Sequence, residues 1–285
     1  MTSALNDAIQ PRFRTIDGLS TRDALSASRD AHALVLSPRP ESRYCYEPTW
    51  TRLAKHTDLV AVDLPGFGQS ERRNALMSPS AMGEFVVRVA DACGLEQPHV
   101  VGPDVGTGAS LFAAARYPGR FRSLDVGTGG AAVPRQLGGV LKAWVEAPSL
   151  APYPQIDGRQ MVTAALGTLE RYRPTEAARE DSLASYAGER FAESMRYVRT
   201  DPEQLPVLRD LLPTIATLVL IIAGAQDPVV PPVNAALLHE RLPTSTPDLL
   251  DALHCIWEDA AAQYAALVTR WWAGGYAAAG GGAGA

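Results

Sequence analysis

The sequence predicts an α/β fold in which a mostly parallel central sheet is covered by helices on both faces. Three observations support this prediction. Apolar, β-branched runs alternate with amphipathic helical segments along most of the chain. The run at 217–222 is apolar on both faces, as is typical of a central parallel strand. The alternation stops at 134–205, where helical stretches with several Pro and Gly breaks indicate an inserted helical cap.

Turn and cap residues place the individual elements. Asp17-Gly18 is typical of a hairpin turn between two strands. Ser78 followed by Pro79 predicts a helix start, because serine caps free N–H groups and proline is tolerated in the first turn, and Gly94 is expected to end that helix. Strands are expected at 13–16, 19–25, 33–36, 59–63, 100–101, 121–126, 217–222 and 248–250, and helices at 49–56, 79–93, 105–117, 234–241 and 260–272.

These elements divide the chain into a core and an insertion. Residues 1–133 are expected to form the first part of the α/β core, 134–205 the helical cap and 206–276 the second part of the core. Residues 277–285 are low in complexity and rich in Ala and Gly, so they are expected to be a disordered tail.

Composition narrows the classes of partner. The chain has 285 residues, 46% of them hydrophobic, and a formal net charge of -5, so it has no basic surface for nucleic acid or anionic membranes. Cys45, Cys93 and Cys255 have no C-x-x-C spacing, which predicts neither a disulfide framework nor a zinc site. We expect a cytoplasmic monomer or homodimer that acts on a small molecule, with no membrane segment, metal or cofactor.

The most informative stretch is Gly102-Pro103-Asp104-Val105-Gly106, which lies between a short β-branched run and an alanine-rich helical segment. Such a strand–turn–helix leaves almost no loop, so its central residue takes a strained conformation and its neighbours must be small. Asp104 would then stand exposed above the sheet. The alternative is that Asp104 is an ordinary helix N-cap.

Two later loops carry an acid and a histidine. Asp227 follows the apolar run at 217–222, and His254 follows the last expected strand. Because the carboxyl ends of parallel strands share one edge of a sheet, both are expected near Asp104. The alternatives are a solvated turn residue for Asp227 and a surface histidine for His254. The order along the chain is nucleophile, acid, histidine, which is the order of the α/β-hydrolase triad.

From about residue 13 to 272 the sequence resembles the α/β-hydrolase superfamily. The resemblance rests on the G-P-D-V-G elbow, the D-L-P-G-F-G-Q-S loop at 63–70, the D-P-V-V-P-P acid loop at 227–232 and the terminal histidine loop. Aspartate at the elbow is similar to the epoxide hydrolase and haloalkane dehalogenase branch. The resemblance implies that Asp104 attacks an sp3 carbon to form an alkyl ester, that His254 activates the water that cleaves it, and that Asp227 orients His254.

The resemblance also assigns an oxyanion hole, formed by the backbone amides of Val105 and Arg39. Here the sequence departs from the family pattern, because Ser37-Pro38-Arg39-Pro40 stands where the family usually has His-Gly-x-Pro. The Arg39 side chain either binds an anionic substrate group or points into solvent.

The leaving group follows from two further positions. Dehalogenases of the family generally have Trp after the nucleophile, and this chain has Val105, which favours an epoxide over a halide. Epoxide hydrolases protonate the ring oxygen with cap tyrosines. Tyr197 best matches that position and is the expected acid, with packing as its alternative role. Trp144, Tyr153 and Tyr172 are expected to line the substrate pocket, and Tyr186 is a further cap tyrosine.

The sequence therefore predicts an enzyme that opens an epoxide, or a similar electrophilic sp3 carbon, through an Asp104 ester. Two alternatives remain open. One is a haloalkane or haloacid dehalogenase. The other is a divergent biosynthetic or binding member that does not hydrolyse, suggested by the altered first loop and by Leu253, where the family usually has Gly before the histidine.

Overall fold

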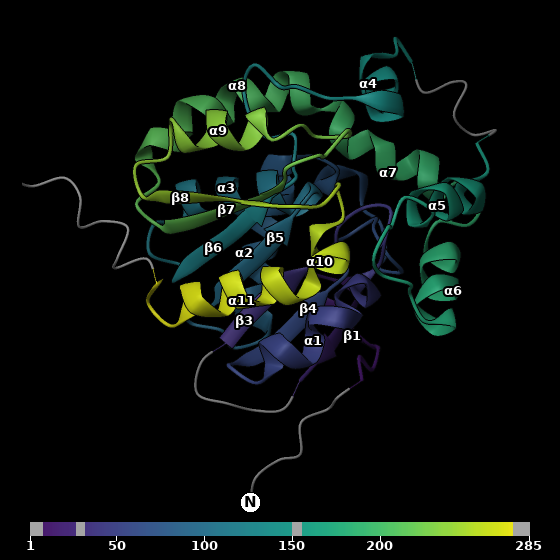
Figure 1. Ribbon diagram of the computed structural model, residues 1–285, viewed down its shortest axis with the longest axis horizontal. Helices are drawn as coiled ribbons and strands as arrows, with labels where there is room; N and C mark the ends of the chain where they lie inside the picture. The colour runs from purple at the N-terminus through teal and green to yellow at the C-terminus, as the bar shows by residue number, and fades with distance from the viewer. Residues whose placement is uncertain (1–7, 27–31, 150–155, 276–285) are drawn as a thin grey trace, which may run out of the picture.

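The computed structural model describes residues 8–26, 32–149 and 156–275. They form the predicted α/β fold around an eight-stranded sheet (Figure 1). From one edge to the other, the strands run in the order β1 (Arg12–Ile16), β2 (Leu19–Leu25), β4 (Asp58–Val62), β3 (His32–Leu36), β5 (His99–Pro103), β6 (Ser123–Gly127), β7 (Leu218–Gly224) and β8 (Ser245–Leu250).

The strands from β4 to β8 pair in parallel, and the β1–β2 hairpin adds an antiparallel edge to β4. Ile16 lies opposite Leu19 across the hairpin, so the turn falls at Asp17-Gly18 as the sequence predicted. The loops after β3, β5, β7 and β8 therefore open at one edge of the sheet, which is where the candidate residues lie.

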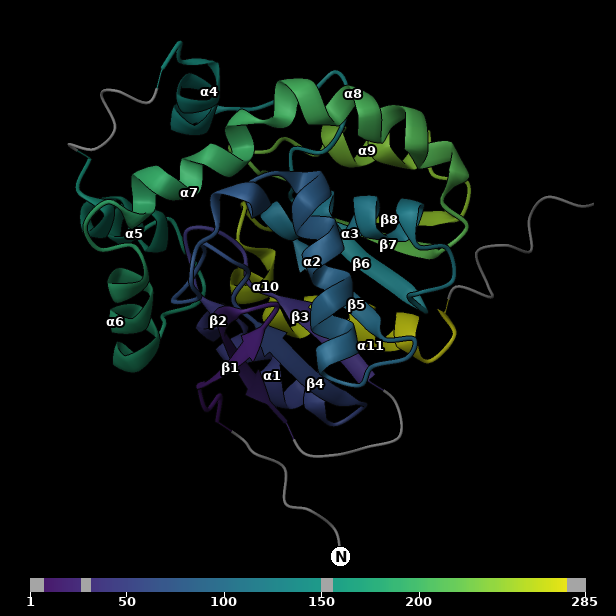
Figure 2. The same cartoon turned by 180° about the vertical axis from the view of Figure 1, so that it is seen from behind.

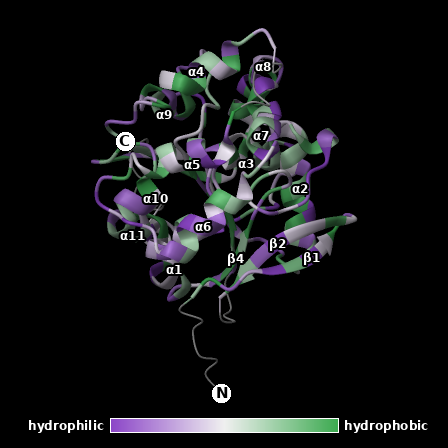
Figure 3. Ribbon diagram, turned by 90° about the vertical axis from the view of Figure 1, so that its right-hand side faces the viewer, coloured by the Kyte–Doolittle hydropathy of each residue, from purple (hydrophilic) through white to green (hydrophobic). Residues whose placement is uncertain are grey.

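Helices cover both faces of the sheet. On one face lie α1 (Glu47–Ala54), α10 (Ile256–Asp259) and α11 (Ala261–Trp272), seen in front in Figure 1. On the other lie α2 (Pro79–Ala92), α3 (Val105–Arg116) and α9 (Val233–His239); α2 is in front in Figure 2. The helices on each face bury their own apolar cluster against the strands. The helices of both layers carry hydrophobic as well as hydrophilic residues, as Figure 3 shows. Ser78 caps α2 by accepting a hydrogen bond from the Ala81 amide, as predicted.

Five α-helices lie between β6 and β7 in the described residues, where the sequence predicted the insertion. They are α4 (Gly139–Glu146), α5 (Gly158–Leu166), α6 (Glu176–Ser185), α7 (Arg190–Arg199) and α8 (Asp201–Leu211). Part of this segment has its own small apolar core, formed by Val162, Leu183, Tyr186 and Phe191. The last helix extends past residue 205 and packs on α2 and α3, because Leu205 and Leu208 join the apolar cluster of that layer.

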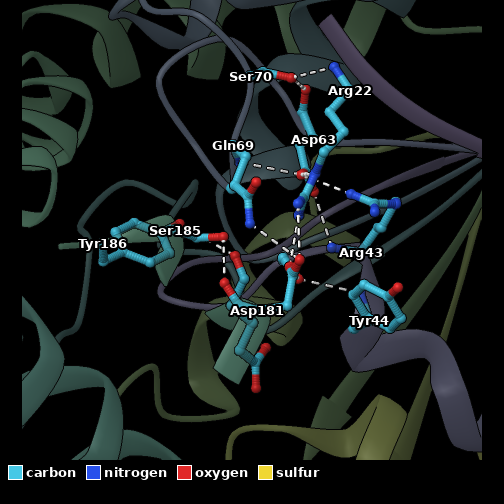
Figure 4. A network of polar contacts seen from close by, with 12 residues as sticks. Arg22, Arg43, Tyr44, Asp63, Gln69, Ser70, Asp181, Ser185 and Tyr186 are labelled. Carbon is cyan, nitrogen blue, oxygen red and sulfur yellow. Dashed lines mark hydrogen bonds and ion pairs between the residues drawn. The ribbon is translucent and has the colours of Figure 1, made fainter. Parts of the chain in front are cut away.

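A buried ion-pair network joins α6 to the sheet (Figure 4). Arg22 of β2 donates from Nε to Asp63 at 2.7 Å and from both terminal nitrogens to Asp181 of α6, at 2.8 and 2.6 Å. Ser42 and Arg43 belong to the same network: the Ser42 hydroxyl donates to Asp181 at 2.6 Å, and Arg43 pairs with Asp63 at 3.0 Å. This network fixes the insertion over the loop that follows β3. Within the described residues, no helix is both long and apolar enough to cross a bilayer.

Removing one carboxylate from this network should be costly. Asp181→Ala leaves Arg22 and Arg43, two fully buried guanidinium groups, to share Asp63 alone. We expect the free energy of unfolding to fall by about 3 kcal/mol, because a buried cation loses its partner. Denaturant unfolding measures the change. The matched control, Asp210→Ala, removes an exposed carboxylate of α8 and should leave the unfolding midpoint unchanged; an equal effect of the two variants would contradict the assignment.

Candidate active site

Asp104 occupies a strained turn between β5 and α3. Its φ of 51° and ψ of -119° lie outside the regions that side chains usually adopt, and its side chain makes no capping hydrogen bond to α3. The alternative of an ordinary N-cap is therefore wrong. The strained conformation is held by the Asp104 amide, which donates to the Gly127 carbonyl at 2.9 Å, and by Thr107, whose hydroxyl donates to the same carbonyl at 3.0 Å.

The two glycines that flank the turn differ in importance. A Cβ on Gly102 would lie 2.4 Å from the Ser110 hydroxyl oxygen and 3.0 Å from the Gly106 carbonyl oxygen, so a small residue is required there. A Cβ on Gly106 would meet only Leu36, at an ordinary 3.5 Å. The steric requirement expected at both positions therefore holds at Gly102, whereas Gly106 has room for a methyl group.

The Asp104 carboxylate lies on the two amides that the sequence analysis assigned to the oxyanion hole. The Arg39 amide donates to Oδ2 of Asp104 at 2.7 Å, and the nearby Val105 amide also favours the ionised carboxylate by lowering its pKa. In an ester of Asp104 the carbonyl oxygen would occupy this donor pair. The site therefore places two N–H groups where negative charge develops when such an ester is attacked.

Asp227 and His254 complete the constellation from the loops after β7 and β8. Nδ1 of His254 lies 2.7 Å from Oδ2 of Asp227, while the other carboxylate oxygen of Asp227 accepts the amides of Val229 and Val230 at 2.8 and 2.9 Å. These bonds fix both the carboxylate and the ring. Nε2 of His254 then lies 3.9 Å from Oδ1 of Asp104. The predicted alternatives of a solvated turn and a surface histidine are both wrong, because Asp227 is fully buried and His254 mostly so.

The buried charges shift one another's pKa values. Burial alone would lower the pKa of His254, but the carboxylates of Asp227, Asp104 and Glu41 outweigh it and raise the pKa to about 9. Burial raises the pKa of Asp104, while His254 and the two backbone amides oppose that shift. His254 therefore holds its proton more tightly than a free imidazole, and it titrates as a pair with Asp104.

Comparison with known proteins agrees with this geometry. A family model described as the alpha/beta hydrolase fold matches residues 39–261. The chain belongs to the α/β-hydrolase family.

The similarity to individual proteins supports the fold of this hydrolase but does not identify its reaction. It is 42% identical over 72 residues to a dihydrolipoyllysine-residue acetyltransferase component of Cupriavidus necator, a match of 25% of the chain that spans only 19% of that relative. An uncharacterized protein of Mycobacterium tuberculosis, Rv2715, is 26% identical over 91% of the chain and 80% of its own length. The structure of 2-hydroxy-6-oxo-6-phenylhexa-2,4-dienoate hydrolase from Rhodococcus has a TM-score of 0.75 at 20% identity, over 94% of this chain and 99% of that one.

A cavity of about 280 Å³ lies over the triad of the hydrolase. Asp104, Val105, Arg39 and His254 line its reactive end. Its remaining wall is mostly apolar and comes largely from the insertion; it includes Val140, Leu141, Trp144, Met161, Ala164, Ala165, Phe191 and Val198. A smaller cavity of about 40 Å³ reaches Asp104 from the side of α8 and is lined by Tyr197 and Asp201, among others. The shape fits a small apolar substrate held between the sheet edge and the insertion.

The aromatic residues predicted for the pocket lie in different places. Trp144 lines the cavity, with its ring edge packed on Phe191 at 5.4 Å between centroids. Tyr172 does not line it, because its hydroxyl donates to Glu47 at 2.8 Å on the side of α1, so its predicted role in substrate binding is not supported. Tyr153 lies outside the described residues.

Tyr197 borders the smaller cavity beside Asp104, but its hydroxyl is engaged. It donates to the carbonyl oxygen of Val105 at 2.7 Å, and its ring packs edge-on against Phe67. In this geometry the proton is not directed at a substrate oxygen. Tyr197 instead holds Val105, whose amide the sequence analysis assigned to the oxyanion hole.

The sequence analysis missed a buried acidic cluster behind the histidine. The side chains of Glu41, Cys255 and Glu258 converge there, and Trp257 donates to Glu41 at 3.2 Å. Burial raises the pKa of both glutamates, and the negative charge of Glu41 raises that of Glu258 further. The only signal in the sequence was position, since Glu41 follows the Ser37-Pro38-Arg39-Pro40 loop and Glu258 lies four residues after His254.

The pKa of His254 should respond to each carboxylate in turn. We expect a value of about 9 in the unmodified protein, a lower value in Asp104→Asn and the lowest in Asp227→Asn, because the first loses one favourable charge and the second loses both the largest charge and its hydrogen bond. Titration of the His254 ring followed by NMR measures these values. Asp251→Asn, which removes an exposed carboxylate of the same loop, is the matched control and should leave the pKa unchanged. An unshifted pKa in Asp104→Asn would contradict the coupling.

Proposed function

We propose that this hydrolase attacks an electrophilic sp3 carbon with the Asp104 carboxylate and then hydrolyses the resulting alkyl ester. The observation that carries the proposal is the position of that carboxylate. It stands on the elbow with one oxygen on the Arg39 amide and the other facing His254. A carboxylate needs no base to become a nucleophile, whereas a serine at the same position would.

In the first step, an oxygen of Asp104 forms a bond to the substrate carbon, and the bond from that carbon to its leaving atom breaks with its electron pair. In the second step, His254 takes a proton from water as the water oxygen attacks the ester carbonyl. The amides of Arg39 and Val105 stabilise the oxyanion. Asp227 stabilises the imidazolium that forms. The intermediate then collapses: its bond to the alkyl oxygen breaks, the Asp104 carboxylate is restored, and the leaving alkoxide takes the proton from His254 and departs as an alcohol.

Ester formation also prepares His254 for its task. The charge of Asp104 is one of the three that raise the pKa of the ring, and alkylation removes it. Once the ester has formed, the pKa of His254 is therefore lower than its value of about 9 in the free enzyme. The ring then loses its proton more readily, at the stage where a base is needed. Ester breakdown is expected to accelerate as pH rises through that lowered pKa.

An epoxide is the first candidate substrate, because Val105 stands where the dehalogenases of the branch place Trp. A halide is the second candidate, for a separate reason. Among the cap tyrosines that the structure describes, Tyr172, Tyr186 and Tyr197 all donate to protein oxygens, so none is aimed at a ring oxygen. A halide leaves without needing such a proton.

Trapping the ester tests the proposal and separates the two leaving groups. His254→Gln removes the base of the second step, so the variant should accumulate one covalent adduct on Asp104. An epoxide such as styrene oxide adds its whole mass, whereas a haloalkane adds its mass less that of the hydrogen halide. Intact-protein and peptide mass spectrometry measure both the adduct and its site.

Two controls accompany the trap. The double variant Asp104→Asn/His254→Gln should form no adduct, and His239→Gln, which changes an exposed histidine of α9, should accumulate none under turnover. The proposal fails if the unmodified enzyme turns a substrate over but the His254→Gln variant forms no covalent adduct of that substrate on Asp104.

Tyr197→Phe distinguishes positioning from acid catalysis. We expect the rate of adduct formation in the His254→Gln background to fall by less than about tenfold, because the hydroxyl holds a backbone carbonyl, whereas loss of a general acid costs roughly 100-fold to 10,000-fold. Stability should fall by about 1 kcal/mol through the lost buried hydrogen bond. Tyr186→Phe, which removes a comparable buried hydroxyl, is the matched control. A large rate loss confined to Tyr197→Phe would restore its role as the acid.

A further inference from the structure

The Arg39 side chain is a buried cation that forms no direct ion pair with any described residue. The residue is only 9% exposed, and within the described parts of the chain its guanidinium forms no ion pair. The other two deeply buried arginines in the described part of the chain are paired, Arg22 with Asp63 and Asp181, and Arg43 with Asp63. An unpaired buried charge is costly, so Arg39 calls for a ligand of opposite charge.

Neutral groups of α7 hold the guanidinium in place. Its Nε donates to the hydroxyl of Ser194 at 2.8 Å, and its Nη2 to the sulfur of Met195 at 2.9 Å. Its central carbon lies 4.4 Å from the centroid of the Phe191 ring, as in a cation–π contact. Among the residues that the structure describes, none accepts a hydrogen bond from Nη1. The group is thus oriented but keeps a free donor.

The elbow carboxylate attracts the Arg39 guanidinium from a distance but makes no direct contact with it. Asp104 accepts the backbone amide of Arg39, and no hydrogen bond joins it to the guanidinium in the described structure. The Arg39 backbone therefore serves the reactive end, while its side chain reaches α7. Arg39 and Phe191 both line the cavity, and the wall beyond them is mostly apolar. A ligand that fits both the Arg39 guanidinium and the apolar wall has an apolar body and one planar anionic group. A carboxylate is such a group, because its two oxygens match the paired N–H donors of a guanidinium.

We infer that Arg39 is a specificity-determining residue that binds a carboxylate carried by the substrate. The substrate class is then a small apolar acid whose electrophilic carbon lies at Asp104 while its carboxylate lies on the α7 side. The inference rests on the proposed function only for the identity of that electrophilic carbon. Anion binding itself requires no covalent step.

A pair of matched probes tests the inference by binding alone. Phenylacetate and phenylacetamide have the same size and differ in charge. By isothermal titration calorimetry, the unmodified protein should bind the acid roughly tenfold or more tightly than the amide, which is the scale of one hydrogen-bonded charge pair. Arg39→Met keeps the apolar stem and should abolish the preference, and Arg39→Lys should retain part of it. Arg209→Met, which removes a partly exposed arginine of α8, should leave the preference unchanged.

Each other outcome contradicts the inference. Equal affinity for acid and amide in the unmodified protein overturns it, and so does a preference that survives in Arg39→Met. If the protein binds bromide but not phenylacetate, the guanidinium is assigned to a leaving halide instead. If Arg39→Met does not fold, as circular dichroism reports, an undiminished preference in Arg39→Lys decides against the fork. Because no probe reacts, these results stand whether or not an Asp104 adduct forms.

Discussion

The strained backbone of Asp104 is the constraint on which the rest of the site depends. A positive φ at a residue with a side chain costs roughly 1–3 kcal/mol and persists only where the surroundings hold it. Here the Gly127 carbonyl accepts both the Asp104 amide and the Thr107 hydroxyl, and the packing around Gly102 admits no side chain. Because β5 and β6 are adjacent, the sheet itself supplies the hydrogen bonds that keep the carboxylate above its edge.

That placement couples two buried carboxylates through one imidazole. Asp227 is fixed by two backbone amides, so His254 has one orientation and one face toward Asp104. The resulting pKa of about 9 would be a disadvantage for a base, if the charge of Asp104 were permanent. In the mechanism that we propose, Asp104 loses its charge on alkylation, which lowers the pKa of His254 in the intermediate alone. A neutral serine at the elbow could not produce this change.

The sequence was sufficient for the fold and the order of the triad because both depend on local signals. Periodicity, turn dipeptides and the residues of the elbow are each read within a few positions, and parallel strands bring their loops together. Partners distant in sequence could not be predicted in this way. The hydroxyl of Tyr197 donates to a carbonyl oxygen 92 residues away in sequence, and Arg22 donates to Asp181 across 159 residues. Glu258 and Glu41, from opposite ends of the chain, influence each other's pKa. For that reason Tyr197 was predicted to be a general acid, because its place in the sequence matches that of the family's acid. Its hydrogen bond to the Val105 carbonyl indicates instead that it positions Val105.

We propose two independent functions for Arg39, one for its backbone and one for its side chain. The oxyanion hole uses only its backbone N–H, which every residue except proline supplies, so catalysis places little restriction on the side chain. The side chain is therefore free to select the substrate. In this chain it extends from the oxyanion hole to Ser194 and Met195, which joins the reactive end of the cavity to its α7 wall. A substrate held at both points would be oriented along the line from Asp104 to α7, and that orientation is what an in-line displacement by a carboxylate requires.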